Sequence, residues 1–231
     1  MNFLRRLQIL KFLLILIMTV IISPVSAFGK SSPEWVADLN VAQDYGQIAI
    51  VKGTKGSEAE FSFHVKDFDG NWSEIISCPA YIGKKGWGKT REGDMKTPKG
   101  MYNFTMAFGI NDFYGCKLGY TKVDDSHYWV GDSHSERYNQ FTSTRYYDDF
   151  DKKDSEHIID YKEAYKYCLN ISYNEDGVPR LGSAIFLHCQ TQNKFTAGCV
   201  AIPEEKMKEV LENVRDDCVV IMDTEKNIKN Y

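Results

Sequence analysis

Two residues near the carboxyl end of the chain have side chains that together support nucleophilic catalysis. Cys199 lies within "NKFTAGCVAIP", residues 193–203, and His188 ends the apolar stretch "GSAIFLH" 11 positions earlier. The reactive form of cysteine is the thiolate, and an unperturbed thiol with a pKa near ~8.5 is mostly protonated at neutral pH. A histidine within hydrogen-bonding reach removes that proton or holds the thiolate as an ion pair. The two residues therefore predict a cysteine nucleophile served by a histidine base.

Two other interpretations of Cys199 are an inert buried thiol and half of a disulfide. Free cysteine is among the most buried residue types, so a lone cysteine favours the first of these. The nearby histidine changes that preference, and its position excludes papain-like and caspase-like enzymes, whose histidine lies far downstream or about 50 residues upstream. The six cysteines include no C-x-x-C pair and have no histidine at ligand spacing, so we expect no metal site and no cofactor. The pairing of the other cysteines stays open.

The two candidate residues must be positioned by neighbouring strands. The stretches "GSAIFLH" and "CVAI" are strand candidates, and we expect them to be antiparallel, with the intervening loop bringing His188 close to Cys199. Gly198 allows a tight turn there. It also lets a substrate carbonyl approach the amides of residues 197–199, including that of Ala197, which would form an oxyanion hole. The wall of the site is expected to include Thr196 and His134.

The rest of the chain predicts a β-rich α+β fold. Segments rich in β-branched and aromatic residues, such as 47–53 and 59–65, are separated by turn residues and indicate a meander of short strands. Pro203 and two glutamates open a predicted helix at 203–214, and "DDCVVIMD" at 216–223 predicts a buried strand. The glycine- and lysine-rich stretch at 83–104 is interpreted as a turn, because "TPKG" places proline second and glycine fourth.

The first 27 residues predict an export signal. They combine a positively charged start, an 11-residue run at 12–22 that is apolar except for Thr19, and a small-residue cleavage pattern ending at Ala27. An uncleaved N-terminal membrane anchor is the alternative, although a bilayer span needs about 20 apolar residues. We therefore expect residues 28–45 to form a linker, residues 46–231 to form one catalytic domain, and the domain to act outside the cytoplasm.

Composition excludes two further classes of protein. A hydrophobic share of 43% is too high for a disordered chain. Without residues 1–27, 25 Lys and Arg face 32 Asp and Glu, and the resulting net charge of −7 argues against nucleic acid as a partner.

Three stretches of the sequence resemble the L,D-transpeptidase (YkuD-domain) family. "GSAIFLH" followed by "TAGCVAIP" is similar to the family's histidine-bearing strand and its [S/T]-x-G-C-[V/I] motif, which is the most specific of the three. "REGDMKTPKGMYNF" at 91–104 resembles the R-x-G-D-x-x-T-P-x-G-x-Y/F element, and "YWVGDSHSERYN" at 128–139 resembles a W-V-x-D-x-x-S-x-x-Y-N element of one branch. The resemblance extends from about Gln47 to the end of the chain.

This resemblance implies a mixed β-sandwich with a few short helices and an enzyme that acts on peptidoglycan. Cys199 would attack the third residue of a donor stem tetrapeptide, and an amine of an acceptor stem would resolve the thioester into a 3-3 crosslink. Water as the acceptor would make the same site a carboxypeptidase, and a catalytically silent wall-binding module is the alternative outside enzymes. The commonest family pattern has glycine and arginine where this chain has Cys189 and Ala201, so the usual contact with the substrate carboxylate is unassigned.

Overall fold

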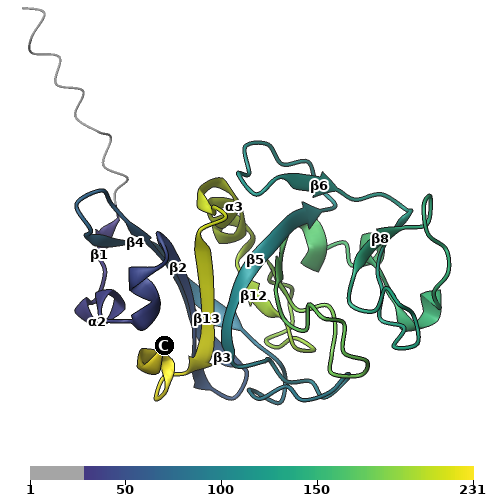
Figure 1. Cartoon of the computed structure of the whole chain (residues 1–231), viewed down its shortest axis with the longest axis horizontal. Helices are drawn as coiled ribbons and strands as arrows, with labels where there is room; N and C mark the ends of the chain where they lie inside the picture. Colours follow the sequence, from purple (N-terminus) through teal and green to yellow (C-terminus); the bar gives the residue numbers. More distant parts are fainter. Residues whose placement is uncertain (1–28) are drawn as a thin grey trace, which may run out of the picture.

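The structure of the protein is a computed structural model that describes residues 29–231. The predicted export signal lies outside these residues. Strands dominate the described part of the chain and the helices are few and short, which confirms the β-rich α+β prediction (Figure 1). Within residues 29–231, no helix is both long and apolar enough to cross a membrane.

Most of the strands belong to one large sheet. Its members are β1 (Lys30–Ser31), β2 (Gln47–Lys55), β3 (Glu58–Lys66), β4 (Trp72–Tyr81), β5 (Gly100–Gly109), β6 (Tyr120–Lys122), β10 (Cys168–Ile171), β11 (Phe186–Cys189), β12 (Val200–Ile202) and β13 (Cys218–Thr224). They follow the order β1-β4-β12-β11-β10-β5-β13-β2-β3, and β6 pairs with β5. Because β3 also pairs with β4, the strands from β4 to β3 in this order form a closed ring of paired strands. The sandwich arrangement stays a prediction.

The strands that carry the candidate site lie inside this closed path. β11 has β10 on one side and β12 on the other, and β12 is also paired with β4. Both edges of each strand are therefore hydrogen-bonded to neighbours, which leaves neither strand free to shift its register.

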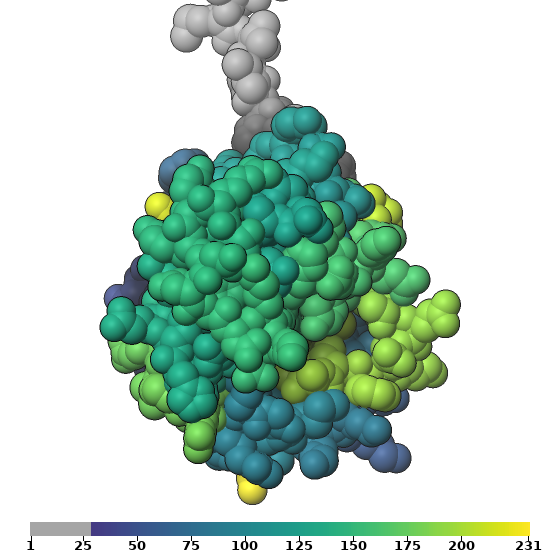
Figure 2. Space-filling view, turned by 90° about the vertical axis from the view of Figure 1, so that its right-hand side faces the viewer, coloured from purple at the N-terminus to yellow at the C-terminus, as the bar shows by residue number. Residues whose placement is uncertain are grey.

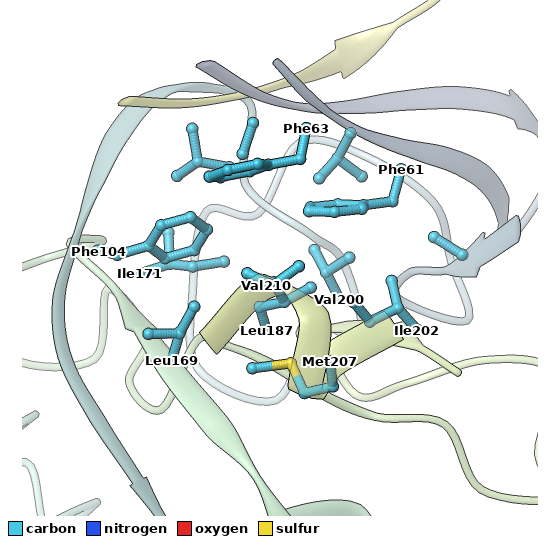
Figure 3. Close-up of a cluster of buried hydrophobic side chains, with 14 of the residues drawn as sticks. Phe61, Phe63, Phe104, Leu169, Ile171, Leu187, Val200, Ile202, Met207 and Val210 are labelled. Carbon is cyan, nitrogen blue, oxygen red and sulfur yellow. The ribbon is translucent and has the colours of Figure 1, made fainter. Parts of the chain in front are cut away.

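The helix α3 (Glu204–Asn213) packs its apolar face into the main core. It begins directly after Pro203, as the sequence predicted, and its side chains Met207, Val210 and Leu211 are fully buried. Figure 3 shows Met207 and Val210 close to Leu187 of β11 and Val200 of β12. Burying an apolar side chain of this size stabilises the fold by roughly 1.5–3 kcal/mol, so this cluster holds the two site strands in place.

Residues 29–45 are part of the folded domain, so the linker expected at 28–45 is a wrong prediction. They form β1, α2 (Glu34–Ala37) and η1 (Asn40–Gln43), and β1 pairs with β4. Val36 and Leu39 are buried in a second core with Ile48 of β2 and Ile221 of β13. The segment is too short and irregular to show a helical period, but its few apolar side chains cover the outer face of the sheet.

A second, three-stranded sheet flanks the large one in the order β8-β7-β9 (Figure 1). Its strands are β7 (His127–Trp129), β8 (Phe141–Ser143) and β9 (Glu156–His157), and the 3-10 turns η2 (Lys152–Asp154), η3 (Ile158–Asp160) and η4 (Ala164–Lys166) surround them; η5 (Ile228–Asn230) ends the chain. The ring of Trp129 packs against Phe186 of β11, with centroids 4.7 Å apart. The small sheet is therefore docked beside the strand that carries His188.

Candidate active site

His188 lies on β11 and Cys199 lies directly before β12, and these neighbouring strands run parallel, so the expected antiparallel pairing is wrong. In the ladder between β11 and β12, His188 lies opposite Ala201, and Cys199 immediately precedes β12. The loop at 190–199 must therefore cross back along the sheet, because parallel strands need a crossover connection and not a hairpin turn. The structure nevertheless brings His188 and Cys199 to the wall of one cavity of about 400 Å³.

Three parts of the chain form the cavity: the loop before β5, the segment from β9 to η4, and residues 183–201. Figure 2 shows this side of the molecule, where the surface is hollowed beside the yellow-green segment of residues 190–200. The cavity that Cys199 lines therefore opens on the side of the molecule that carries the three-stranded sheet.

Main-chain groups hold the thiol of Cys199. Cys199 is 7% exposed, and its Sγ donates to the carbonyl of Ala184 at 3.1 Å and accepts from the amide of Phe186 at 3.4 Å. Burial, with a smaller contribution from the carboxylate of Glu156, raises the pKa of the thiol to about 12. All six cysteines of the chain are free thiols, so Cys199 is not half of a disulfide.

The imidazole of His188 is arranged as a neutral base. Its Nδ1 lies 2.9 Å from the carbonyl oxygen of Cys189. Because a carbonyl only accepts, Nδ1 carries the hydrogen and Nε2 keeps a free lone pair. Burial lowers the pKa of the ring to about 4, against the opposing effect of the carbonyl. The ring of Tyr165 packs edge-on against the imidazole, with centroids 5.5 Å apart.

At neutral pH the resting pair is therefore a neutral thiol and a neutral imidazole. Of the two arrangements that the sequence left open, the structure favours proton removal during attack over a preformed ion pair. The thiol hydrogen points to the carbonyl of Ala184 at rest, so it must turn toward Nε2 of His188 before general-base catalysis begins.

Two threonine hydroxyls fix the turn that leads into Cys199. Thr97 Oγ1 donates to the carbonyl of Gly198 at 2.8 Å, and Thr196 Oγ1 donates to the carbonyl of Cys199 at 2.7 Å. Thr196 Oγ1 also accepts from the amide of Gly198 at 3.1 Å, and the residue lines the cavity. Since the amide of Gly198 is engaged, the amides of Ala197 and Cys199 are the donors of this turn that an oxyanion would use.

A close main-chain approach explains why residue 198 is glycine. A Cβ at this position would lie 3.0 Å from the carbonyl oxygen of Lys96 and 3.2 Å from Cδ1 of Ile185. Both distances are tighter than ordinary van der Waals contact, so any side chain would push the turn away from the loop before β5. Thr97 also joins this loop to the turn, through its hydrogen bond to Gly198; the sequence analysis placed Thr97 in an expected turn and in the 91–104 family element but not in the site.

His134 does not reach the cavity, and its assignment to the wall of the site is wrong. Its side chain is 81% exposed and its Nδ1 lies 3.4 Å from Asp132. The loop that carries His134 is connected to the site by Asn139. The Oδ1 of Asn139 accepts hydrogen bonds from Trp129 Nε1 at 2.9 Å and from the amide of Ala184 at 3.0 Å. Asn139 therefore positions the residue whose carbonyl holds the thiol.

Lys89 is a buried cation on the cavity wall that the sequence analysis did not single out. Its side chain is 2% exposed, and its Nζ lies 3.3 Å from Oδ1 of Asp94. Asp94 also accepts from the amides of Thr90, Arg91 and Lys96. Although burial opposes ionisation, these hydrogen bonds and Lys89 hold the pKa of Asp94 below its usual value. Because an ammonium has three donors, Lys89 retains capacity for a second anion.

The loop that carries Lys89 is not a phosphate-binding loop. Residues 83–90, "GKKGWGKT", match the spacing G-x-x-x-x-G-K-[ST], but such a loop needs a following helix whose N-terminus holds the phosphate. Turns, isolated bridges and then the strand β5 follow here. The stretch contains turns at residues 84–85 and 92–93, but Thr97 lies in an isolated bridge with Trp87 and Gly100 begins β5, so the turn expected at Thr97–Gly100 is wrong.

Two carboxylates on the cavity wall were also missed. Glu92 Oε2 accepts from the hydroxyl of Ser183 at 2.9 Å, and Glu156 Oε2 accepts from the hydroxyl of Tyr165 at 2.6 Å. Burial raises the pKa of Glu156 to about 7. Glu156 belongs to a long acidic, tyrosine-rich stretch, and no feature of the sequence separates it from its solvated acidic neighbours.

The fold and the site define a class of protein: a β-rich domain in which a histidine on one strand and a cysteine directly before the adjacent parallel strand line one cavity. The family model of the L,D-transpeptidase catalytic domain (YkuD) matches residues 63–222. The chain belongs to this family, which confirms the resemblance found in the sequence.

Solved structures similar to this chain include three proteins of low sequence identity. The helical cell shape determining protein Pgp2 from Campylobacter jejuni is 16% identical over 82% of this chain and 54% of that chain, with a TM-score of 0.44. The Ldtfm-avibactam carbamoyl enzyme is 10% identical over 78% and 49%, with a TM-score of 0.34, and an L,D-transpeptidase (Yku) from Stackebrandtia nassauensis is 13% identical over 87% and 61%, with a TM-score of 0.32. The chain thus spans between 49% and 61% of the length of these proteins. No curated protein matches it.

Proposed function

We propose that this protein is an exported, cysteine-dependent peptidoglycan L,D-transpeptidase. It would cleave a stem tetrapeptide through a thioester on Cys199 and transfer the acyl group to an amine of a second stem. Family membership supports stem peptides as the substrate class. The observation that carries the proposal is the presence, in one cavity, of the buried thiol of Cys199 and a neutral His188 whose Nε2 is free to accept its proton.

The first half of the reaction forms the thioester. Sγ of Cys199 attacks the carbonyl carbon of the third stem residue while Nε2 of His188 takes the thiol proton. The amides of Ala197 and Cys199 donate to the oxyanion that develops on the carbonyl oxygen. When the intermediate collapses, the carbon–nitrogen bond to the terminal D-alanine breaks and its amine leaves with the proton from His188.

The second half resolves the thioester. The amine of an acceptor stem attacks the same carbonyl carbon and gives up a proton to Nε2 of His188. The carbon–sulfur bond then breaks, and the departing sulfur of Cys199 recovers the proton. Both residues return to their neutral resting state, and a 3-3 crosslink has been made. Attack by water in place of the amine would yield a tripeptide, which is the carboxypeptidase reaction.

Lys89 offers the substrate-carboxylate contact that Ala201 does not. Both residues line the cavity, and Nζ of Lys89 would lie 3.7 Å from a Cβ placed on Gly198, next to the nucleophile. The terminal D-alanine of the donor carries a carboxylate, and an ammonium is an effective partner for one. We assign Lys89 to that group.

Export is part of the proposal, because the predicted signal at residues 1–27 would bring the domain to a substrate that lies outside the cytoplasm. Fractionation of cells that produce the full chain tests this part. The protein is expected in the extracytoplasmic fraction, and retention in the cytoplasm would contradict it.

Mass spectrometry of the purified protein with a stem tetrapeptide or a carbapenem tests the chemistry. We expect an adduct on Cys199 that is absent in Cys199→Ala and reduced in His188→Ala. Cys116→Ala, which removes a half-buried thiol outside the cavity, is the matched control and should form the adduct normally. Failure of the folded wild-type protein to form any adduct would contradict the enzymatic proposal.

The products decide between the alternatives. Dimeric muropeptides indicate transpeptidation, and tripeptides alone indicate an L,D-carboxypeptidase. A silent wall-binding module would show no turnover and would bind cell walls equally well as wild type and as Cys199→Ala.

A further inference from the structure

The catalytic cavity carries more negative than positive charge. Its charged wall residues are Lys89, Glu92 and Glu156, and the charge of Lys89 is already matched by the buried carboxylate of Asp94. Across residues 29–231, no ammonium or guanidinium group lies within ion-pair distance of Glu156 or Glu92. The walls therefore suit a ligand that brings a positive charge.

Glu156 is held so that its carboxylate borders the cavity. It stands on β9 of the small sheet, where it lies opposite Trp129 of β7. Its Oε2 accepts from the hydroxyl of Tyr165 at 2.6 Å, and that residue packs its ring against His188. One oxygen of Glu156 is thus fixed by the protein close to the catalytic base, and Oε1 has no hydrogen-bond donor among the described residues.

A carboxylate in this position works against the nucleophile in the empty enzyme. Burial of an ionised carboxylate without a cation is unfavourable, and its negative charge disfavours the thiolate of Cys199. The pKa of His188 is instead set by burial and by the carbonyl of Cys189. The charge of Glu156 therefore bears on the nucleophile more than on the base, and a cation bound to it would relieve both penalties.

We propose that Glu156 binds a primary ammonium group of the stem-peptide substrate at the wall of the catalytic cavity. The inference rests on the proposed function, because that function supplies an amine on both the donor and the acceptor stem. Glu156 is then a specificity-determining residue that selects peptides carrying a free side-chain amine.

A kinetic comparison of two tetrapeptides tests the proposal. One carries a third residue with a free side-chain amine, and the other has the same amine acetylated. The readout is kcat/KM for release of D-alanine. The wild-type protein is expected to prefer the free amine by about 10- to 100-fold, the range of one charge-assisted hydrogen bond. Glu156→Gln is expected to lose this preference by becoming slow on the free amine only.

Two further variants separate charge from positioning. Glu156→Gln keeps an acceptor for the hydroxyl of Tyr165, whereas Tyr165→Phe removes that hydrogen bond and leaves the carboxylate. If Glu156 only positions Tyr165 and His188, Tyr165→Phe slows both peptides and Glu156→Gln leaves their ratio unchanged, which overturns the proposal. Glu175→Gln, an exposed residue outside the cavity, is the charge-matched control and should behave like wild type.

Separate measurements of the two half-reactions show whether the donor stem or the acceptor stem supplies the amine that Glu156 binds. If the donor supplies it, Glu156→Gln slows release of D-alanine without any acceptor present. If the acceptor supplies it, that release is normal and only transfer from the acyl-enzyme to an added amine slows. If wild type releases D-alanine from both donor peptides equally well and Glu156→Gln transfers the acyl group at the normal rate, the inference about Glu156 is overturned and the proposed function stands. If wild type forms no adduct on Cys199, the proposed function is contradicted as well.

Discussion

Replacing Glu156 with glutamine is expected to stabilise the ligand-free protein at neutral pH while leaving its stability at pH 4 almost unchanged. The pKa of this carboxyl is raised by burial from 4.5 to about 7. Between these values the folded protein binds more protons than the unfolded chain. The contribution of Glu156 to stability therefore falls as the pH rises through this window, and glutamine, which has no charge to bury, shows no such fall.

The magnitude follows from the same pKa change. Each pKa unit corresponds to about 1.4 kcal/mol, so a rise from 4.5 to about 7 predicts a gain of about 3 kcal/mol in Glu156→Gln at pH 8, declining to almost nothing at pH 4. The lowered pKa values of His188 and His64 also make stability depend on pH, but in both proteins equally, so they cancel in the difference.

Urea unfolding of wild type and Glu156→Gln at pH 4, 5, 6, 7 and 8 measures this difference directly. Glu175→Gln, which changes an exposed carboxylate, is the control for loss of one charge and should show no comparable rise. A difference between wild type and Glu156→Gln that is flat across the range, or a variant less stable than wild type at pH 8, would refute the assignment of Glu156 as a partly buried carboxylate without a cationic partner.

Four other predictions follow from the site. In the Glu156→Gln background, the rate of Cys199 acylation should stay at its pH 7 value as the pH falls to about 5 and halve near pH 4, because burial holds the pKa of His188 there; a midpoint near 6.5 would contradict a buried base. Thr97→Ala should lower the free energy of unfolding by about 1–3 kcal/mol and slow acylation, whereas Thr97→Ser should not, as chemical denaturation and D-alanine release would show. Gly198→Ala should slow acylation about 10-fold or more with the circular dichroism spectrum unchanged, because the methyl group meets the carbonyl of Lys96; wild-type kinetics would show that the turn tolerates it. Lys89→Met should raise KM about 10-fold for a tetrapeptide ending in a carboxylate but not for the C-terminal amide, and an equal effect on both would remove Lys89 from substrate binding.

Several elements were predictable because their signals are local. The helix α3 has proline before its first turn, glutamates within it and apolar residues at helical spacing, and it forms where expected. The β-rich character also followed from the short alternating segments. The linker prediction at 28–45 failed because Val36 and Leu39 gain their burial from β2 and β13, which are distant in the sequence.

The site, like the fold, was only partly predictable from the sequence. The spacing of His188 and Cys199 identified the pair, but the two strands run parallel and do not form the expected antiparallel arrangement. A parallel arrangement depends on how β12 pairs with β4, which no local pattern around residue 199 reveals. His134 failed as a wall residue for a related reason, since Asn139 and not His134 makes the contact to Ala184.

The sequence by itself determined the chemical identity of the site: a cysteine, a histidine 11 positions before it, and a glycine that allows a tight turn directly before the cysteine. Tertiary structure alone decided their protonation and their surroundings. A pKa depends on desolvation and on charges that arrive from distant segments, so the neutral pair of His188 and Cys199 became visible only in the folded chain. For the same reason Lys89 and Glu156, which look like ordinary surface residues in the sequence, became cavity residues only once the loop before β5 and the small sheet closed around the thiol.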